Sequence, residues 1–132
     1  MQRSLLDDSN ADRLFCLIAF GKALIAEGDF RAAEEQFRIA LGILEQRPRD
    51  TWTVGEVKSS LGECLLRSNR LSEAEPYLLG AYQTLAPVWG DDHPRTRKAG
   101  KLLAEVYELS GRADEAAKFK EPARQIDPSG GS

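Results

Sequence analysis

Histidine, cysteine and long apolar runs are scarce in this chain of 132 residues, which holds 1 His and 2 Cys. No Cys-x-x-Cys, His-Glu-x-x-His, Gly-x-Ser-x-Gly or Gly-rich phosphate loop occurs, so the usual sequence signatures of metal sites, hydrolases and nucleotide sites are missing. No apolar run approaches the ~20 residues that cross a bilayer, and the polar residues 1–10 do not resemble a signal peptide. We therefore expect no catalytic residue, no metal, no cofactor and no membrane contact.

Charge of one sign is not in excess either. The 18 Lys and Arg residues against 21 Asp and Glu give a net charge of −3, which argues against a nucleic-acid partner because such proteins need a concentrated cationic surface. Cys16 and Cys64 lie in helix-like apolar patterns, without metal-ligand spacing. In the absence of an export signal we expect both to be buried, reduced thiols of a cytoplasmic protein.

The residues that are abundant favour helices. The chain has 17 Leu and 16 Ala, but only 13 Val, Ile and Thr together, and straight-chain residues and Ala lose little rotamer freedom in a helix. Apolar residues recur at helical spacing, as in Val54, Val57, Leu61 and Leu65. The sequence therefore predicts an all-α fold.

An internal repeat of 41 to 42 residues organises these helices. Each copy has a turn residue, an Ala five positions later and a small residue seven positions earlier; good N-cap types, Ser9, Asp50 and Asp92, stand further upstream. The repeated structural positions are Gly21, Gly28 and Ala33 in the first copy, Gly62, Asn69 and Ala74 in the second, and Ala104, Gly111 and Ala116 in the third. A left-handed residue ends a helix and a small residue allows close packing, so each copy is a helical hairpin.

The pattern predicts an α-solenoid of three stacked antiparallel hairpins, because a single hairpin cannot bury its own apolar stripe. We assign residues 1–8 to an N-terminal segment and residues 9–126 to one domain, with repeats at about 9–47, 48–88 and 89–126. The remaining residues, 127–132, are expected to form a flexible tail, and Pro122 should shorten or kink the last helix.

These residues resemble tetratricopeptide repeats (TPRs), and the long period together with the segment Trp89–Thr96 resembles the extended repeats of kinesin light chains and of many bacterial repeat proteins. The resemblance implies a right-handed superhelix and a non-catalytic scaffold that binds a protein or peptide in its concave groove, as part of a larger protein. It also implies which residues face that groove: Phe15, Ile18, Lys22, Ile25, Ser59, Glu63, Leu66, Arg67, Lys98, Lys101, Glu105 and Glu108.

Two alternatives stay open from the residues alone. The apolar first hairpin, with Phe15, Ile18 and Ile25, could instead meet a second copy of the chain and form a homodimer. Trp52 and Trp89 could anchor a partner, although sealing the core at a helix junction is the more common role. His93 is interpreted as part of a turn that leads into a helix, not as a catalytic residue.

Overall fold

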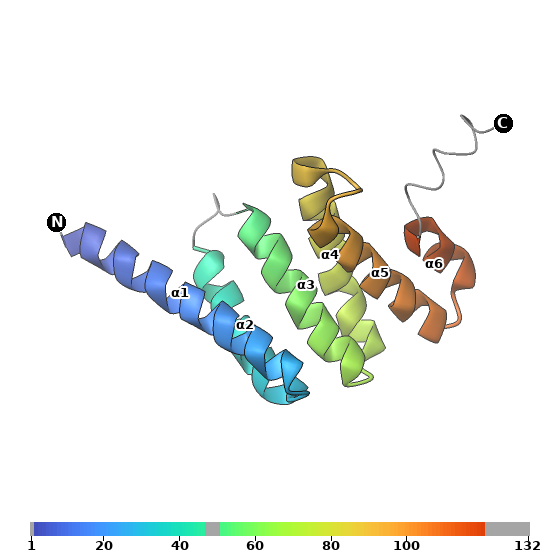
Figure 1. Cartoon of the computed structure of the whole chain (residues 1–132), viewed down its shortest axis with the longest axis horizontal. Coiled ribbons are helices and arrows are strands. Elements are labelled where there is room, and N and C mark those ends of the chain that lie inside the picture. Colours follow the sequence, from blue (N-terminus) through green and yellow to red (C-terminus); the bar gives the residue numbers. More distant parts are fainter. Residues whose placement is uncertain (1, 47–50, 121–132) are drawn as a thin grey trace.

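The computed structural model describes residues 2–46 and 51–120, and over these ranges the chain is helical, with short turns. The helices are α1 (Gln2–Ala26), α2 (Phe30–Leu44), α3 (Thr51–Arg67), α4 (Leu71–Trp89), α5 (Pro94–Leu109) and α6 (Ala113–Lys120). Each helix packs against the next along the chain. Figure 1 shows the resulting stack of hairpins, from α1 and α2 at one end to α5 and α6 at the other. This arrangement confirms the all-α solenoid.

The three hairpin turns share one hydrogen-bond pattern. Gly28, Asn69 and Gly111 have φ values of 83°, 63° and 77°, in the left-handed region that Gly and Asn tolerate. In the first turn, Gly28 N–H donates to the Ile25 carbonyl and Asp29 N–H donates to the Leu24 carbonyl, both at 2.9 Å. The other two turns repeat this pair of bonds, which is the Schellman motif. The repeated turn residues therefore have a direct conformational cause.

Two helical glycines allow the helices of a hairpin to approach closely. A Cβ on Gly21 would lie 2.6 Å from the ring of Phe37, and a Cβ on Gly62 would lie 2.5 Å from Cγ of Leu78. Phe37 and Leu78 are both fully buried. The space of the missing methyl group is thus filled by a core side chain from the partner helix, and the same contact recurs in two hairpins.

Partly exposed ion pairs join successive hairpins on the side of the second helices. Arg70 Nη1 lies 2.8 Å from Glu34 of the preceding hairpin, and Arg112 Nη1 lies 2.7 Å from Glu75. Both arginines directly follow a turn residue, and both glutamates hold equivalent positions in α2 and α4. We call this repeated pairing the arginine ladder.

Several of the expectations from the sequence need correction or stay untested. The expected N-cap at Ser9 is wrong, because Ser9 lies inside α1, which begins at Gln2; α1 therefore also runs across the expected boundary between residues 8 and 9, and the division into domains stays a prediction. Cys16 is exposed, contrary to expectation, whereas Cys64 is buried as expected. Asp50, Pro122 and the tail 127–132 lie outside the described residues.

Candidate protein-interaction groove

The first helices of the three hairpins form the surface on which a groove was expected. Contacts between α1 and α3, and between α3 and α5, place these helices next to one another. Their facing side chains are joined by ion pairs. Lys22 lies 2.5 Å from Glu56, Arg67 lies 2.7 Å from Glu105, and the Lys98 ammonium lies 3.5 Å from Glu63.

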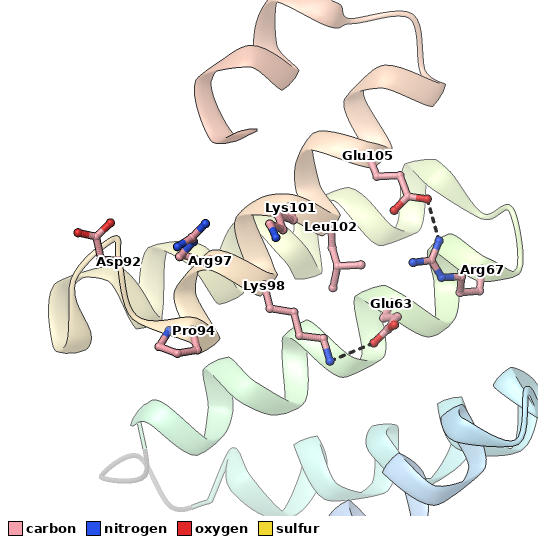
Figure 2. Close-up of a pocket in the computed structure, with 9 residues that line it drawn as sticks. All are labelled: Glu63, Arg67, Asp92, Pro94, Arg97, Lys98, Lys101, Leu102 and Glu105. Atoms are coloured by element: carbon pink, nitrogen blue, oxygen red, sulfur yellow. Dashed lines mark hydrogen bonds and ion pairs between the residues drawn. The ribbon is translucent and has the colours of Figure 1, made fainter. Parts of the chain in front are cut away.

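A hollow of about 690 Å³ opens between α3 and α5. It is lined by Glu63, Arg67, Asp92, Pro94, Arg97, Lys98, Lys101, Leu102 and Glu105. Figure 2 shows the pairs Lys98–Glu63 and Arg67–Glu105 at the wall of this hollow, with Lys101 and Arg97 beside them on α5. Five of the expected groove residues therefore share one site: Glu63, Arg67, Lys98, Lys101 and Glu105.

The charges in the hollow do not cancel. The hollow is lined by four basic and three acidic side chains. Two of the acidic residues, Glu105 and Glu63, form ion pairs with Arg67 and Lys98. Lys101 and Arg97 are exposed, and no ion pair joins either of them to another of the described residues. The hollow thus presents two free cations and one free carboxylate, that of Asp92.

Glu63 sits at the base of this arrangement, with only 15% of its side chain exposed. Its Oε1 atom is buried and makes no hydrogen bond among the described residues, so the contact with Lys98 at 3.5 Å is an attraction of charge. Cys64 follows Glu63 on α3 and is fully buried. Burial, with a smaller effect of the Glu63 charge, raises the pKa of the Cys64 thiol to about 12, which makes this thiol inert at neutral pH.

The remaining expected groove residues divide into three groups. Phe15 and Lys22 are exposed on α1, and Glu108 is exposed near the end of α5. Ile18 and Ile25 are half-buried and pack against the core. Ser59 and Leu66 are largely buried, at 5% and 4% exposed, although Ser59 lines a second, smaller hollow together with Lys22 and Lys98. The groove surface is therefore more polar than the repeat positions implied.

Asp92, Pro94 and Arg97 line the hollow but were not expected to do so. Asp92 was expected as an N-cap type, but the cap of α5 lies one residue later. His93 is the N-cap of α5, accepting a hydrogen bond at Nδ1 from the Arg95 N–H at 3.1 Å, and Pro94 is the first residue of the helix. The turn places its side chains at the groove because it directly precedes a groove helix.

The two tryptophans, at the start of α3 and the end of α4, form an aromatic cluster with His93. The rings of Trp52 and Trp89 lie 5.7 Å apart, and His93 stacks on Trp89 with a centroid distance of 4.3 Å. The Arg95 guanidinium lies 5.3 Å from the Trp89 ring centroid and 3.4 Å from Glu56. Trp52 remains 43% exposed. Trp89 packs against the buried residues Ala81, Leu85 and Ala99 at the junction of α4 and α5, whereas for Trp52 the choice between sealing the core and anchoring a partner stays open. The Arg95 guanidinium lies over both tryptophan rings.

A comparison with protein families identifies the type of repeat. The model of the tetratricopeptide repeat matches residues 53–129, more than half of the chain. The chain belongs to the tetratricopeptide repeat family. No curated protein matches the sequence.

Membership of the TPR family indicates a non-catalytic repeat that mediates protein–protein interaction. Within residues 2–46 and 51–120, no cluster of His, Cys, Asp and Glu could hold a metal ion. None of the helices in that part of the chain is both long and apolar enough to span a membrane.

Proposed function

We propose that this TPR array binds an extended peptide segment of a partner protein in the groove of α1, α3 and α5, and that an acidic side chain of the peptide enters the hollow of Figure 2. The observation that carries the proposal is the free charge of Lys101 and Arg97 beside two satisfied ion pairs. Charge-assisted hydrogen bonds from lysine and arginine to a carboxylate are among the stronger polar contacts in proteins.

The ion pairs make the groove rigid before any ligand arrives. Lys22–Glu56 joins α1 to α3, and Arg67–Glu105 joins α3 to α5. A preformed groove loses little conformational entropy on binding, which leaves more of the interaction energy for affinity. Leu102, at the floor of the hollow, offers an apolar contact for the aliphatic part of the ligand.

Protein partners fit the composition as well as the site. The net charge of −3 supports a protein ligand in preference to a nucleic acid. We also propose that the chain serves as a scaffold in the cytoplasm, within a larger protein, on the basis of its repeat type and its reduced cysteines.

The test is a peptide array in which acidic, neutral and basic extended peptides are probed with the purified chain, followed by titration of the best binders. Lys101→Glu and Arg97→Glu should each weaken an acidic peptide by about tenfold or more, because each change replaces an attraction by a repulsion. Arg31→Glu is the matched control, since Arg31 is an exposed cation on α2, away from the groove. Equal binding of neutral peptides, or binding unaffected by both groove variants, would refute the proposal.

A second candidate function is self-assembly through the first hairpin. The specific observation in its favour is the exposure of large apolar side chains on α1, where Phe15 is 73% and Phe20 is 55% exposed. Exposed aromatic residues on one helix indicate an interaction surface. Ile18 and Ile25, which the sequence suggested for this contact, pack inward instead.

A further inference from the structure

The helix α1 exposes a face that is buried in both of the later hairpins. The residues of this face are Cys16, Ala19, Phe20 and Ala23, all of which are exposed. Their counterparts one repeat later are Val57, Ser60, Leu61 and Cys64, and one repeat further on are Ala99, Leu102, Leu103 and Val106; none of these is more than 5% exposed. We call the four exposed residues of α1 the open face.

The reason for the difference lies in the neighbours of each helix. All three helices pack against the second helix of their own hairpin, but α3 also packs against α2, and α5 also packs against α4. Positions that are buried in α3 and α5 but exposed in α1 are therefore those that a preceding helix covers. The open face has the shape and apolar character of a helix-binding surface, and it lies at the outer end of the stack in Figure 1.

The first hairpin lacks the arginine that forms the ion pair with the preceding hairpin in the two later hairpins. Arg70 and Arg112 join their hairpins to the preceding one through the arginine ladder, but the equivalent position in the first hairpin is Asp29. Asp29 instead caps α2, accepting a hydrogen bond from the Ala32 N–H at 3.3 Å. A hairpin stacked here in the manner of the others would thus meet an aspartate where its glutamate needs an arginine, so a different kind of helix fits this surface better.

The charges that flank the open face are complementary to each other. Arg13 and Glu27 are both exposed. Arg13 lies on the same stripe of α1 as Cys16, Phe20 and Ala23, and Glu27, the first residue after the end of α1 at Ala26, continues the spacing of three and four residues. No ion pair joins Arg13 or Glu27 to another residue in the described part of the chain. Phe20 stands midway between them, seven residues from each.

We propose that the open face binds the open face of a second copy of this chain, through an antiparallel pair of α1 helices with the two-fold axis at Phe20. This pairing places Arg13 opposite Glu27 of the second copy at one end and repeats the pair at the other, about 21 Å away at 1.5 Å per residue. Such a contact is isologous and closes on itself. The inference rests on self-assembly, the second candidate function, and names its partner surface and register.

The proposed interface leaves the peptide groove free. At 100° per residue, Phe15 and Lys22 lie about 140° and about 160° round α1 from Phe20, the middle of the stripe. A single helix pair of this length buries less than the ~1,600 Å² of a standard interface, so we expect a dissociation constant in the micromolar range. Cys16 of the two copies would be about 12 Å apart along the axis, too far for a disulfide.

The experiment is sedimentation equilibrium of the full chain over about 1 to 500 µM, with circular dichroism to verify that each variant folds. The wild type should pass from monomer to dimer over this range. Phe20→Glu should raise the dissociation constant at least a hundredfold, whereas the matched control Phe15→Glu, which alters a still more exposed aromatic of α1 outside the open face, should leave it within about twofold. A maleimide should alkylate Cys16 more slowly as the dimer forms.

A second pair of variants tests the register. Arg13→Glu should weaken the dimer about tenfold, because two attractions become repulsions, and adding Glu27→Arg should restore the wild-type constant. Strict monomers at all concentrations would overturn both self-assembly and this inference. A dimer that survives Phe20→Glu, or that Glu27→Arg fails to rescue, would leave self-assembly standing and overturn the α1 pairing. Neither result bears on peptide binding, which the groove variants test.

Discussion

Gly62 offers the sharpest test of how the hairpins are held together, through its substitution by alanine. A methyl group at this position would lie 2.5 Å from Cγ and 2.6 Å from Cδ2 of Leu78, both closer than packed carbon atoms can approach. Leu78 is fully buried on α4, so it has no free space into which to turn. Either the leucine leaves its preferred rotamer or the two helices move apart.

The magnitude follows from two opposing effects. Overpacking a close-packed core costs about 1–3 kcal/mol, whereas alanine stabilises a helix interior by about 1 kcal/mol relative to glycine. Gly80→Ala on α4 should show almost only the gain in helix propensity, because its Cβ would meet only the Lys58 side chain, at an ordinary contact distance of 3.6 Å. The difference in unfolding free energy between the two variants should therefore equal the overpacking cost, about 1–3 kcal/mol, with Gly62→Ala the less stable.

Chemical denaturation followed by circular dichroism measures both free energies, provided that the two variants unfold with the same denaturant dependence. Leu78→Ala should lower the unfolding free energy less in the Gly62→Ala background than in the wild type, because the double-mutant cycle then removes the clashing group. The reasoning would be refuted if Gly62→Ala stabilised the chain as much as Gly80→Ala does, because the close approach of α3 and α4 would then make no measurable contribution to the free energy of unfolding.

Three other predictions concern charges and caps. The pKa of Cys64 is raised from 9.0 to about 12 in the folded chain, so as the pH rises the unfolded chain loses this proton first. The free energy of unfolding should therefore fall between pH 9 and 12, by at most about 1.4 kcal/mol per pH unit. Denaturation of Cys64→Ala at several pH values should show a flatter decline. Glu34→Gln weakens the first rung of the arginine ladder and should cost about 1 kcal/mol in a urea titration, whereas Glu35→Gln, at an exposed site, should cost nothing measurable. His93→Ala removes the N-cap of α5 and should lower stability by about 1 kcal/mol and alter tryptophan fluorescence, while His93→Asp, which keeps a capping side chain, should retain most of the stability.

The sequence predicted the hairpins well because their determinants are local. A left-handed turn admits few residues, so Gly28, Asn69 and Gly111 stand out without knowledge of the rest of the chain. A glycine within a helix, as at positions 21 and 62, likewise indicates a close contact, although only the structure identifies Phe37 and Leu78 as the partners. Such features depend on backbone conformation and on packing within one hairpin.

The groove and the open face were less predictable because they depend on contacts between hairpins. Helical periodicity identifies Cys16 as apolar but says nothing of whether another helix covers it, and the expected burial is wrong for that reason. Similarly, the repeat register predicts that Ser59 and Leu66 face the groove, but it does not indicate that contacts within the stack leave only 5% and 4% of these residues exposed. The ion pair of Arg67 with Glu105 joins residues 38 positions apart, a distance over which sequence spacing carries no signal.

The positions of the two proposed surfaces have a consequence for binding strength. In the two proposals, Phe15 and Lys22 belong to the groove and Phe20 belongs to the open face, so the one helix α1 would carry both surfaces without competition. A pair of chains joined at Phe20 would therefore hold two groove sites in one particle. Binding of a partner with two copies of the peptide would then gain from effective concentration, which exceeds single-site affinity without any new contact. Phe20→Glu should remove that gain and leave the affinity for a single peptide unchanged, because the groove itself is built within one chain.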